Sequence, residues 1–323
     1  MTNEEYRQRL IRFANQLVLK RVPLPLLRRP NPESQFSSLI ESVDHLLTES
    51  HRQRKLLLPN LAAFNNKDIG VFSDYSGEGS GRYFVYSVLV CGMNMRLSFE
   101  NRAAVARAES DLGGKEIAFK DLNMGQMRRT LPGFLEAADQ LPGFLCTVAV
   151  EKGIRSVFGS EVDASRQLAQ VLEDAGVGSR PPKTAEKMMR VVHLVSYLTA
   201  LLGHDQQNIF WMTDNDEICP TPTQHHSLLE VFARVLPLYR QPNSQFGIIG
   251  GATPFEERDV PLNDLLSLPD LVAGTLGDYL TKRDQQPDNI LVKEAAGDIF
   301  LWLTRPGVGL KKSACSYALN PMG

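Results

Sequence analysis

Apolar residues form two kinds of segment along the chain. Segments of the first kind are short and rich in β-branched and aromatic residues, which is typical of buried strands. Segments of this kind lie at 69–74, 82–91, 144–152 and 208–213. Segments of the second kind are longer, and their apolar side chains recur every three or four positions, as in amphipathic helices. These helical segments lie at 103–110, 124–139, 184–202, 224–239 and 262–280. Because the two kinds alternate from residue 69 onward, the pattern predicts an α/β fold.

Two weaker signals predict additional short strands. Residues 115–121 follow a Gly-Gly pair and carry Ile117 and Phe119, and residues 246–249 form an apolar run just before another Gly-Gly pair. We expect the second of these to be an edge strand, because it is short and only partly apolar.

The segment before residue 67 differs from the rest, because it carries two amphipathic helical stretches separated by a proline-rich break. These helices are expected at 6–17 and 37–47. The interpretation divides the chain into a helical N-terminal extension over 1–66, an α/β domain over 67–285 with an expected helical insertion at 154–182, and a C-terminal extension over 286–323.

Composition restricts the protein class more than the mechanism. The chain has 43% apolar and 22% charged residues, which is ordinary for a globular protein. A net charge of −2 produces no global field for nucleic acid, so such binding needs a local basic patch. The four cysteines form no CxxC pair, the N-terminus is too polar for a secretory signal, and no run reaches membrane-spanning length. We therefore expect a cytoplasmic protein that does not enter membranes.

Basic residues are concentrated in residues 1–66. The favoured interpretation is a solvated helical surface that docks on the main domain, because Glu and Asp are interspersed among the basic residues. The alternatives are an arm that contacts phosphates or helices that bind a protein partner.

Carboxylates stand at the ends of several apolar elements or inside them. They are Asp74, Glu116, Glu151, Asp214, Asp216 and Asp270. Most follow a strand, whereas Asp270 stands among Leu, Val, Ala and Gly in a helical segment. A lone buried carboxylate is unfavourable unless it is paired or bound to a metal ion. Strand ends and a helix can meet at one edge of a sheet, so we expect several of these acids to converge there.

Oxygen ligands favour Mg²⁺ or Mn²⁺ over zinc, and a pair of such ions can support phosphodiester hydrolysis. The motifs of three other chemistries are absent from the sequence. It has no GxxxxGK[ST] loop for P-loop phosphate binding, no HExxH for a zinc protease and no Gly-x-Ser-x-Gly for a serine hydrolase. The glycines at 77, 79 and 81 precede a predicted strand, which is the wrong context for dinucleotide binding. For Asp216, a solvated acidic loop is at least as good an interpretation as metal binding.

Two motifs, FSDYSGEGSGRYFVYSVLV and LSLPDLVAG, resemble the domain-of-unknown-function 3800 family, which looks ribonuclease H-like. The resemblance spans roughly residues 68–282 and implies a mixed five-stranded sheet flanked by helices, with the first three strands antiparallel. It also implies a metal-dependent nuclease that acts in phage defence or mobile-element biology. By position, Asp74 would be the first-strand ligand and Asp270 the last-helix ligand. Glu151, which ends the strand expected beside the first, would come next, with Glu116 in an edge role.

Two residues depart from the family pattern: Tyr75 stands where the family usually has Glu, and Pro269 precedes the last Asp. The sequence therefore supports two hypotheses. The first is a nuclease that hydrolyses RNA or DNA with Mg²⁺ or Mn²⁺ bound by Asp74, Glu151, Asp270 and Asp214 or Asp216. The alternative is a catalytically inactive ribonuclease H-like module that binds a partner.

Overall fold

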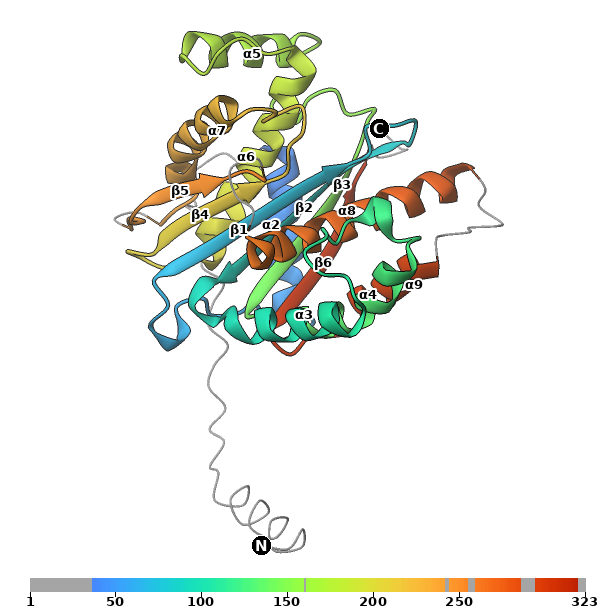
Figure 1. The fold of residues 1–323 in the computed structure, drawn as a ribbon. Coiled ribbons are helices and arrows are strands. Elements are labelled where there is room, and N and C mark those ends of the chain that lie inside the picture. The colour runs from blue at the N-terminus through green and yellow to red at the C-terminus, as the bar shows by residue number, and fades with distance from the viewer. Residues whose placement is uncertain (1–36, 160, 242–243, 255–258, 286–293, 319–323) are drawn as a thin grey trace, which may run out of the picture.

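The computed structural model describes residues 37–159, 161–241, 244–254, 259–285 and 294–318. The helix expected at 6–17 lies outside this part. The described residues form a mixed β-sheet with helices on both faces (Figure 1), which confirms the predicted α/β class. None of the helices in these ranges combines the length and the apolar character needed to cross a bilayer.

The sheet has six strands in the order β5-β4-β1-β2-β3-β6. Their bounds are β1 Asp68–Ser76, β2 Tyr83–Gly92, β3 Gly143–Glu151, β4 Asn208–Thr213, β5 Ile249–Ala252 and β6 Leu310–Tyr317. β1, β2 and β3 are antiparallel neighbours, β4 runs parallel to β1 and to β5, and β6 runs parallel to β3.

The prediction of five strands was wrong because β6 joins the sheet from a stretch expected to be an extension. β6 carries Lys311 and Lys312, so it lacks the continuous apolar run that marks the central strands. Lys312 is accommodated because its Nζ lies 2.8 Å from Asp139 Oδ1 and 4.2 Å from the centre of the Trp302 ring. Edge strands commonly carry lysine, which conceals them from a hydrophobicity criterion.

Helices cover each face of the sheet and bury a separate apolar core there. Their bounds are α2 Ser38–Arg52, α3 Leu97–Glu109, α4 Gly125–Ala138, α5 Ala164–Asp174, α6 Pro182–Leu202, α7 Pro222–Val235, α8 Val260–Gln285 and α9 Glu294–Thr304. The core with α2, α6 and α7 takes Val71 from β1, and the core with α3, α4, α8 and α9 takes the next residue, Phe72. Side chains that alternate along β1 thus supply both cores.

The helix predicted at 37–47 is present as α2, and it docks on the main domain, as the favoured interpretation expects. It buries Leu39 and Val43 in the core beside α6, and Tyr197 donates a 3.0 Å hydrogen bond to its Asp44. One segment differs from its predicted structure. Residues 115–121 were predicted to be a strand, but they form a loop that ends in a short 3-10 helix at Phe119–Asp121.

Candidate functional site

Asp74 stands at the end of β1 on the face covered by α8. Phe72 and Ser76, two positions before and after it, also face α8: Phe72 packs in the α8 core, and Ser76 Oγ donates a 2.7 Å hydrogen bond to the carbonyl of Ala273. Asp74 is 7% exposed, and its Oδ1 accepts the N–H of Tyr75. The carboxylate is therefore buried between strand and helix.

Asp214 lies next to Asp74 because β4 runs parallel to β1. Thr213 pairs with Ser73, and the N–H of Asp214 donates a 3.2 Å hydrogen bond to the carbonyl of Ser73. Asp74 thus lies near the carboxyl end of β1 and Asp214 directly after the carboxyl end of β4, at an edge where ligand sites of α/β sheets commonly form.

The helix α8 brings Asp270 to the same edge. Two glycines allow its close approach: a Cβ at Gly274 would overlap the ring of Phe119, and one at Gly277 would lie 2.7 Å from Ser76 Oγ. The Oδ2 of Asp270 accepts the N–H of Phe119 at 2.6 Å. Pro269, one of the departures from the family pattern, is accommodated inside this helix.

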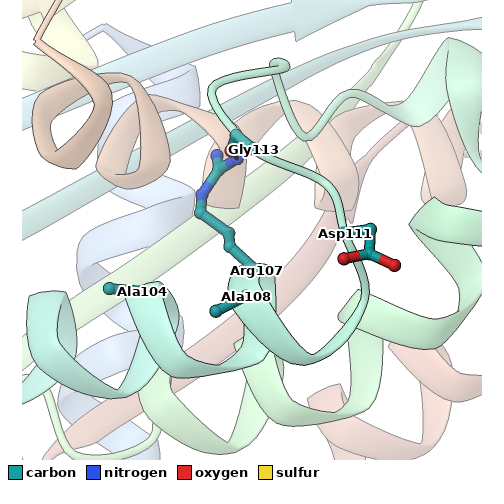
Figure 2. A pocket seen from close by; sticks show the side chains of 5 residues that line it. All are labelled: Ala104, Arg107, Ala108, Asp111 and Gly113. Carbon is teal, nitrogen blue, oxygen red and sulfur yellow. Dashed lines mark hydrogen bonds between the residues drawn. The ribbon is translucent and has the colours of Figure 1, made fainter.

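The loop that carries Glu116 is held by a buried arginine. Figure 2 shows Arg107 reaching from α3 toward Gly113. Its Nη1 donates to the carbonyls of Gly113 and Lys115 at 2.9 and 2.7 Å, and its Nε donates to Asp264 Oδ2 at 3.0 Å. These bonds hold the start of the loop that carries Glu116.

A pocket of about 510 Å³ opens beside this arginine (Figure 2). Its lining residues are Ala104, Arg107, Ala108, Asp111 and Gly113. None of the candidate acids lines it, so we do not assign it to their chemistry.

Electrostatics connect Asp74, Asp214, Asp270 and Glu116, which we call the acid cluster. Burial raises the pKa of Asp74 well above its usual range, and the charges of Asp270 and Asp214 raise it further. Burial likewise raises the pKa of Asp270 to about 7, although the Phe119 N–H opposes the shift. Asp214 and Glu116 add to the rise at Asp270, and Lys120 opposes it. A proton or a cation would relieve this repulsion.

Glu151 lies away from the acid cluster, although the sequence placed it there. β2, not β3, lies beside β1, and the register puts Thr147 level with Asp74 through Ser87. Glu151 is four residues farther along β3, so its Cα lies roughly 15 Å from that of Asp74. Its Oε1 pairs instead with Arg82 Nη2 at 2.7 Å.

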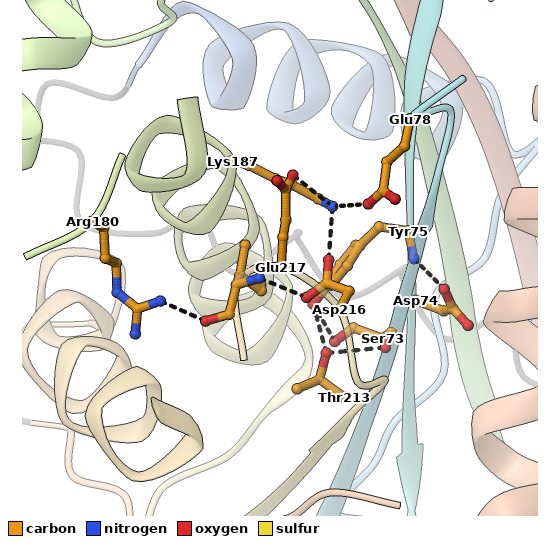
Figure 3. Close-up of polar contacts among 10 residues, drawn as sticks. Ser73, Asp74, Tyr75, Glu78, Arg180, Lys187, Thr213, Asp216 and Glu217 are labelled. Atoms are coloured by element: carbon orange, nitrogen blue, oxygen red, sulfur yellow. Dashed lines mark hydrogen bonds and ion pairs between the residues drawn. The ribbon is translucent and has the colours of Figure 1, made fainter. Parts of the chain in front are cut away.

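Tyr75 and Asp216 face the other side of the sheet (Figure 3). The hydroxyl of Tyr75 lies 2.7 Å from Ser73 Oγ and 2.9 Å from Thr213 Oγ1, and Asp216 pairs with Lys187 at 2.7 Å. Successive strand side chains point to opposite faces, so tyrosine at this position removes no oxygen ligand from the side of Asp74. The departure at Tyr75 therefore carries no argument against the acid cluster.

No group of three or more His, Cys, Asp or Glu side chains in the described part of the chain is arranged to hold a metal ion. The donor chemistry of the acid cluster nevertheless fits a hard cation, because its members offer carboxylate oxygens only. The raised pKa values of Asp74 and Asp270 are a second point of fit, since a bound cation would replace the protons that burial favours.

Comparisons of the chain with protein-family models, with curated proteins and with solved structures returned no match. The function is therefore argued from the acid cluster and its surroundings.

Sequence reasoning missed two buried cations near the acid cluster, Arg107 and Lys187. Asp264, the partner of Arg107, stands in the apolar stretch LNDLLSL, so a charged residue within an apolar helical segment was the available signal for this pair. Lys187 carries no such signal, because Glu186 and Arg190 are charged neighbours in the same helix.

Replacing Tyr75 by phenylalanine is expected to leave the acid cluster intact. The change removes the hydroxyl between Ser73 and Thr213, so we expect a loss of about 1–2 kcal/mol in unfolding free energy. Urea denaturation measures this loss. In Mn²⁺ calorimetry, the Tyr75→Phe variant should have the same dissociation constant as the wild type. A large loss of Mn²⁺ affinity would mean that Tyr75 acts on the acid cluster.

The stability of the metal-free protein is expected to fall as the pH rises from about 4 to about 7. The pKa of Asp270 is about 7 when folded against a usual 3.8, so the folded state binds the extra proton in this window. Asp270→Asn should therefore gain stability relative to wild type with rising pH, as measured by urea denaturation across this range. Asp278→Asn, on the same helix, controls for the lost charge, and parallel curves for Asp270→Asn and wild type would contradict the raised pKa.

Proposed function

We propose that this protein is a metal-dependent nuclease that hydrolyses phosphodiester bonds of RNA or DNA on a ribonuclease H-like fold. The convergence of Asp74, Asp214 and Asp270, from two parallel strand ends and one helix, is the observation that carries the proposal. The antiparallel arrangement of β1, β2 and β3, which the family resemblance implies, supports the fold assignment.

Asp74, Asp214 and Asp270 hold Mg²⁺ or Mn²⁺, and Glu116 contributes from the adjacent loop. When bound, such ions activate a water molecule and stabilise the leaving oxygen of a phosphodiester. The protein supplies the fixed carboxylates: Asp74 is held by the strand, and Asp270 is oriented by the N–H of Phe119. Glu116 is 59% exposed at its side chain, so it can turn toward the other acids.

A cleavage assay tests this proposal directly. Labelled single-stranded and duplex RNA and DNA are incubated with the protein in Mg²⁺, in Mn²⁺ and in a chelator. We expect cleavage of at least one substrate that depends on the divalent ion, together with saturable Mn²⁺ binding by calorimetry. If the protein cleaves none of these substrates and does not bind Mn²⁺ at millimolar concentrations, the assignment is contradicted.

One observation favours the alternative of a catalytically inactive binding module. The Oδ2 of Asp270 already accepts a short hydrogen bond from Phe119, which competes with metal binding at that oxygen. On this alternative, the protein would bind nucleic acid or a protein partner without Mn²⁺ binding. The calorimetric titration therefore separates the two functions.

A further inference from the structure

A buried lysine gathers acids on the face of the sheet opposite to the acid cluster. Lys187 belongs to α6, and its side chain is 6% exposed. Its Nζ lies 2.6 Å from Glu78, 2.7 Å from Asp216 and 3.2 Å from Glu217 (Figure 3). Burial alone would lower the pKa of Lys187, but the charge and hydrogen bonds of Asp216 and Glu78 outweigh burial and raise it. The lysine is therefore charged.

The acids around Lys187 come from the two chain segments that leave β1 and β4. Glu78 lies in the turn after β1, which ends at Ser76, and Asp216 and Glu217 lie in the loop after β4. The Nζ of Lys187 also lies 5.7 Å from the centre of the Tyr75 ring. The lysine thus ties together the two strand ends that carry Asp74 and Asp214.

The loop after β4 connects this tie to Asp214 through its backbone, because Asp216 lies two residues beyond Asp214 and is itself held in place. Asp216 Oδ1 accepts the N–H of Ile218 at 2.9 Å, and Arg180 Nη1 donates to the carbonyl of Ile218 at 2.7 Å. On the other side, the N–H of Asp214 donates to the carbonyl of Ser73. Asp214 is thus fixed between β1 and an acid that is itself paired with the buried lysine.

We propose that Lys187 is a positioning residue of the acid cluster, which acts from the opposite face of the sheet, through Asp216, to hold Asp214 beside Asp74. A neutral side chain of similar length would leave Asp216 partly buried without its cation. An uncompensated buried charge is strongly unfavourable, so the loop would rearrange to expose it, and Asp214 would move with it. The consequence for metal binding rests on the proposed function, whereas the consequence for the loop does not.

The test compares Lys187→Met with wild type by two measurements. Amide hydrogen exchange at Asp214 reports the hydrogen bond to Ser73 without any metal, and it should become about 10- to 100-fold faster. Mn²⁺ calorimetry should give a dissociation constant weaker by about 10- to 100-fold, as for other supporting residues of metal sites. Lys183→Met, at the exposed start of the same helix, is the matched control and should change neither value.

The two measurements separate positioning from a general loss of structure. A merely structural defect would reduce the number of Mn²⁺ sites per chain and leave their dissociation constant unchanged, and that result would overturn the inference. If Lys187→Met does not fold, the double variant Lys187→Met/Asp216→Asn leaves no unpaired buried charge, but it still lacks the ion pair that ties the loop to α6. Exchange at Asp214 should therefore also be faster than wild type in the double variant, and the same two values decide the question.

Failure of the inference and failure of the proposed function give different results. If exchange at Asp214 in the double variant is as slow as in the wild type, the positioning role is overturned, whether or not the Mn²⁺ dissociation constant changes. Absence of Mn²⁺ binding by the wild type would instead refute the nuclease assignment, and faster exchange at Asp214 would still support the structural part of the inference.

Discussion

Replacing Asp74 by asparagine is expected to abolish metal-dependent cleavage while the protein stays folded. The asparagine keeps an oxygen for the N–H of Tyr75, but it removes the charge at the centre of the acid cluster. Loss of a ligand should exceed the about 10- to 100-fold effect of supporting residues, so neither cleavage nor Mn²⁺ binding should be measurable. Because the charge of Asp74 is buried beside other acids, the thermal midpoint at neutral pH should be maintained or raised.

The matched control is Glu151→Gln. Glu151 also ends a buried strand, but it pairs with Arg82 and lies away from the acid cluster, so this variant should cleave and bind Mn²⁺ like wild type. Undiminished cleavage by Asp74→Asn would refute the assignment. Loss of cleavage in Glu151→Gln, with Asp74→Asn active, would mean that the site lies at the end of β3.

Replacing Arg107 by methionine should destabilise the protein by about 3–5 kcal/mol, because it leaves the Asp264 carboxylate buried without a cation. The two side chains are only 7% and 4% exposed. The change also removes the donor to the carbonyls of Gly113 and Lys115, so the loop that carries Glu116 should loosen. Urea denaturation measures the loss of stability.

Two further variants identify the cause of that loss. Arg107→Met/Asp264→Leu removes both charges and should restore much of the stability, although the Gly113 and Lys115 carbonyls still lack their donor. Arg102→Met removes a 54% exposed arginine from the same helix and should change stability by less than about 1 kcal/mol. A loss of that small size for Arg107→Met would contradict the importance of the buried pair.

The rhythm of apolar residues was sufficient to locate the central strands but not to order them. The segment predicted at 144–152 is β3, Gly143–Glu151, and the segment at 208–213 is β4. Which strand lies beside β1 depends on long-range pairing, which a local pattern does not contain. For that reason the sequence ranked Glu151 above Asp214 as a metal ligand, although Asp214 is the acid that lies next to Asp74.

The orientation of Tyr75 was available from the sequence, because a residue next to Asp74 in a strand must point to the opposite face. The buried pairs of Arg107 and Lys187 were not available in the same way. Arg107 and Asp264 lie more than 100 positions apart, as do Lys187 and Glu78. Asp216 lies closer to Lys187 in the sequence but in a different element, so only the tertiary fold brings these charges together.

The pairing of β6 with β3 has a consequence for how the chain folds during synthesis. Gly143 pairs with Leu310, so the two partners lie 167 positions apart in the chain. Until residues 310–317 have been made, the side of β3 that pairs with β6 is an open strand edge that other chains can reach. Contacts of such long range also form slowly. The nascent chain is therefore expected to need protection from edge-to-edge aggregation until β6 covers this edge.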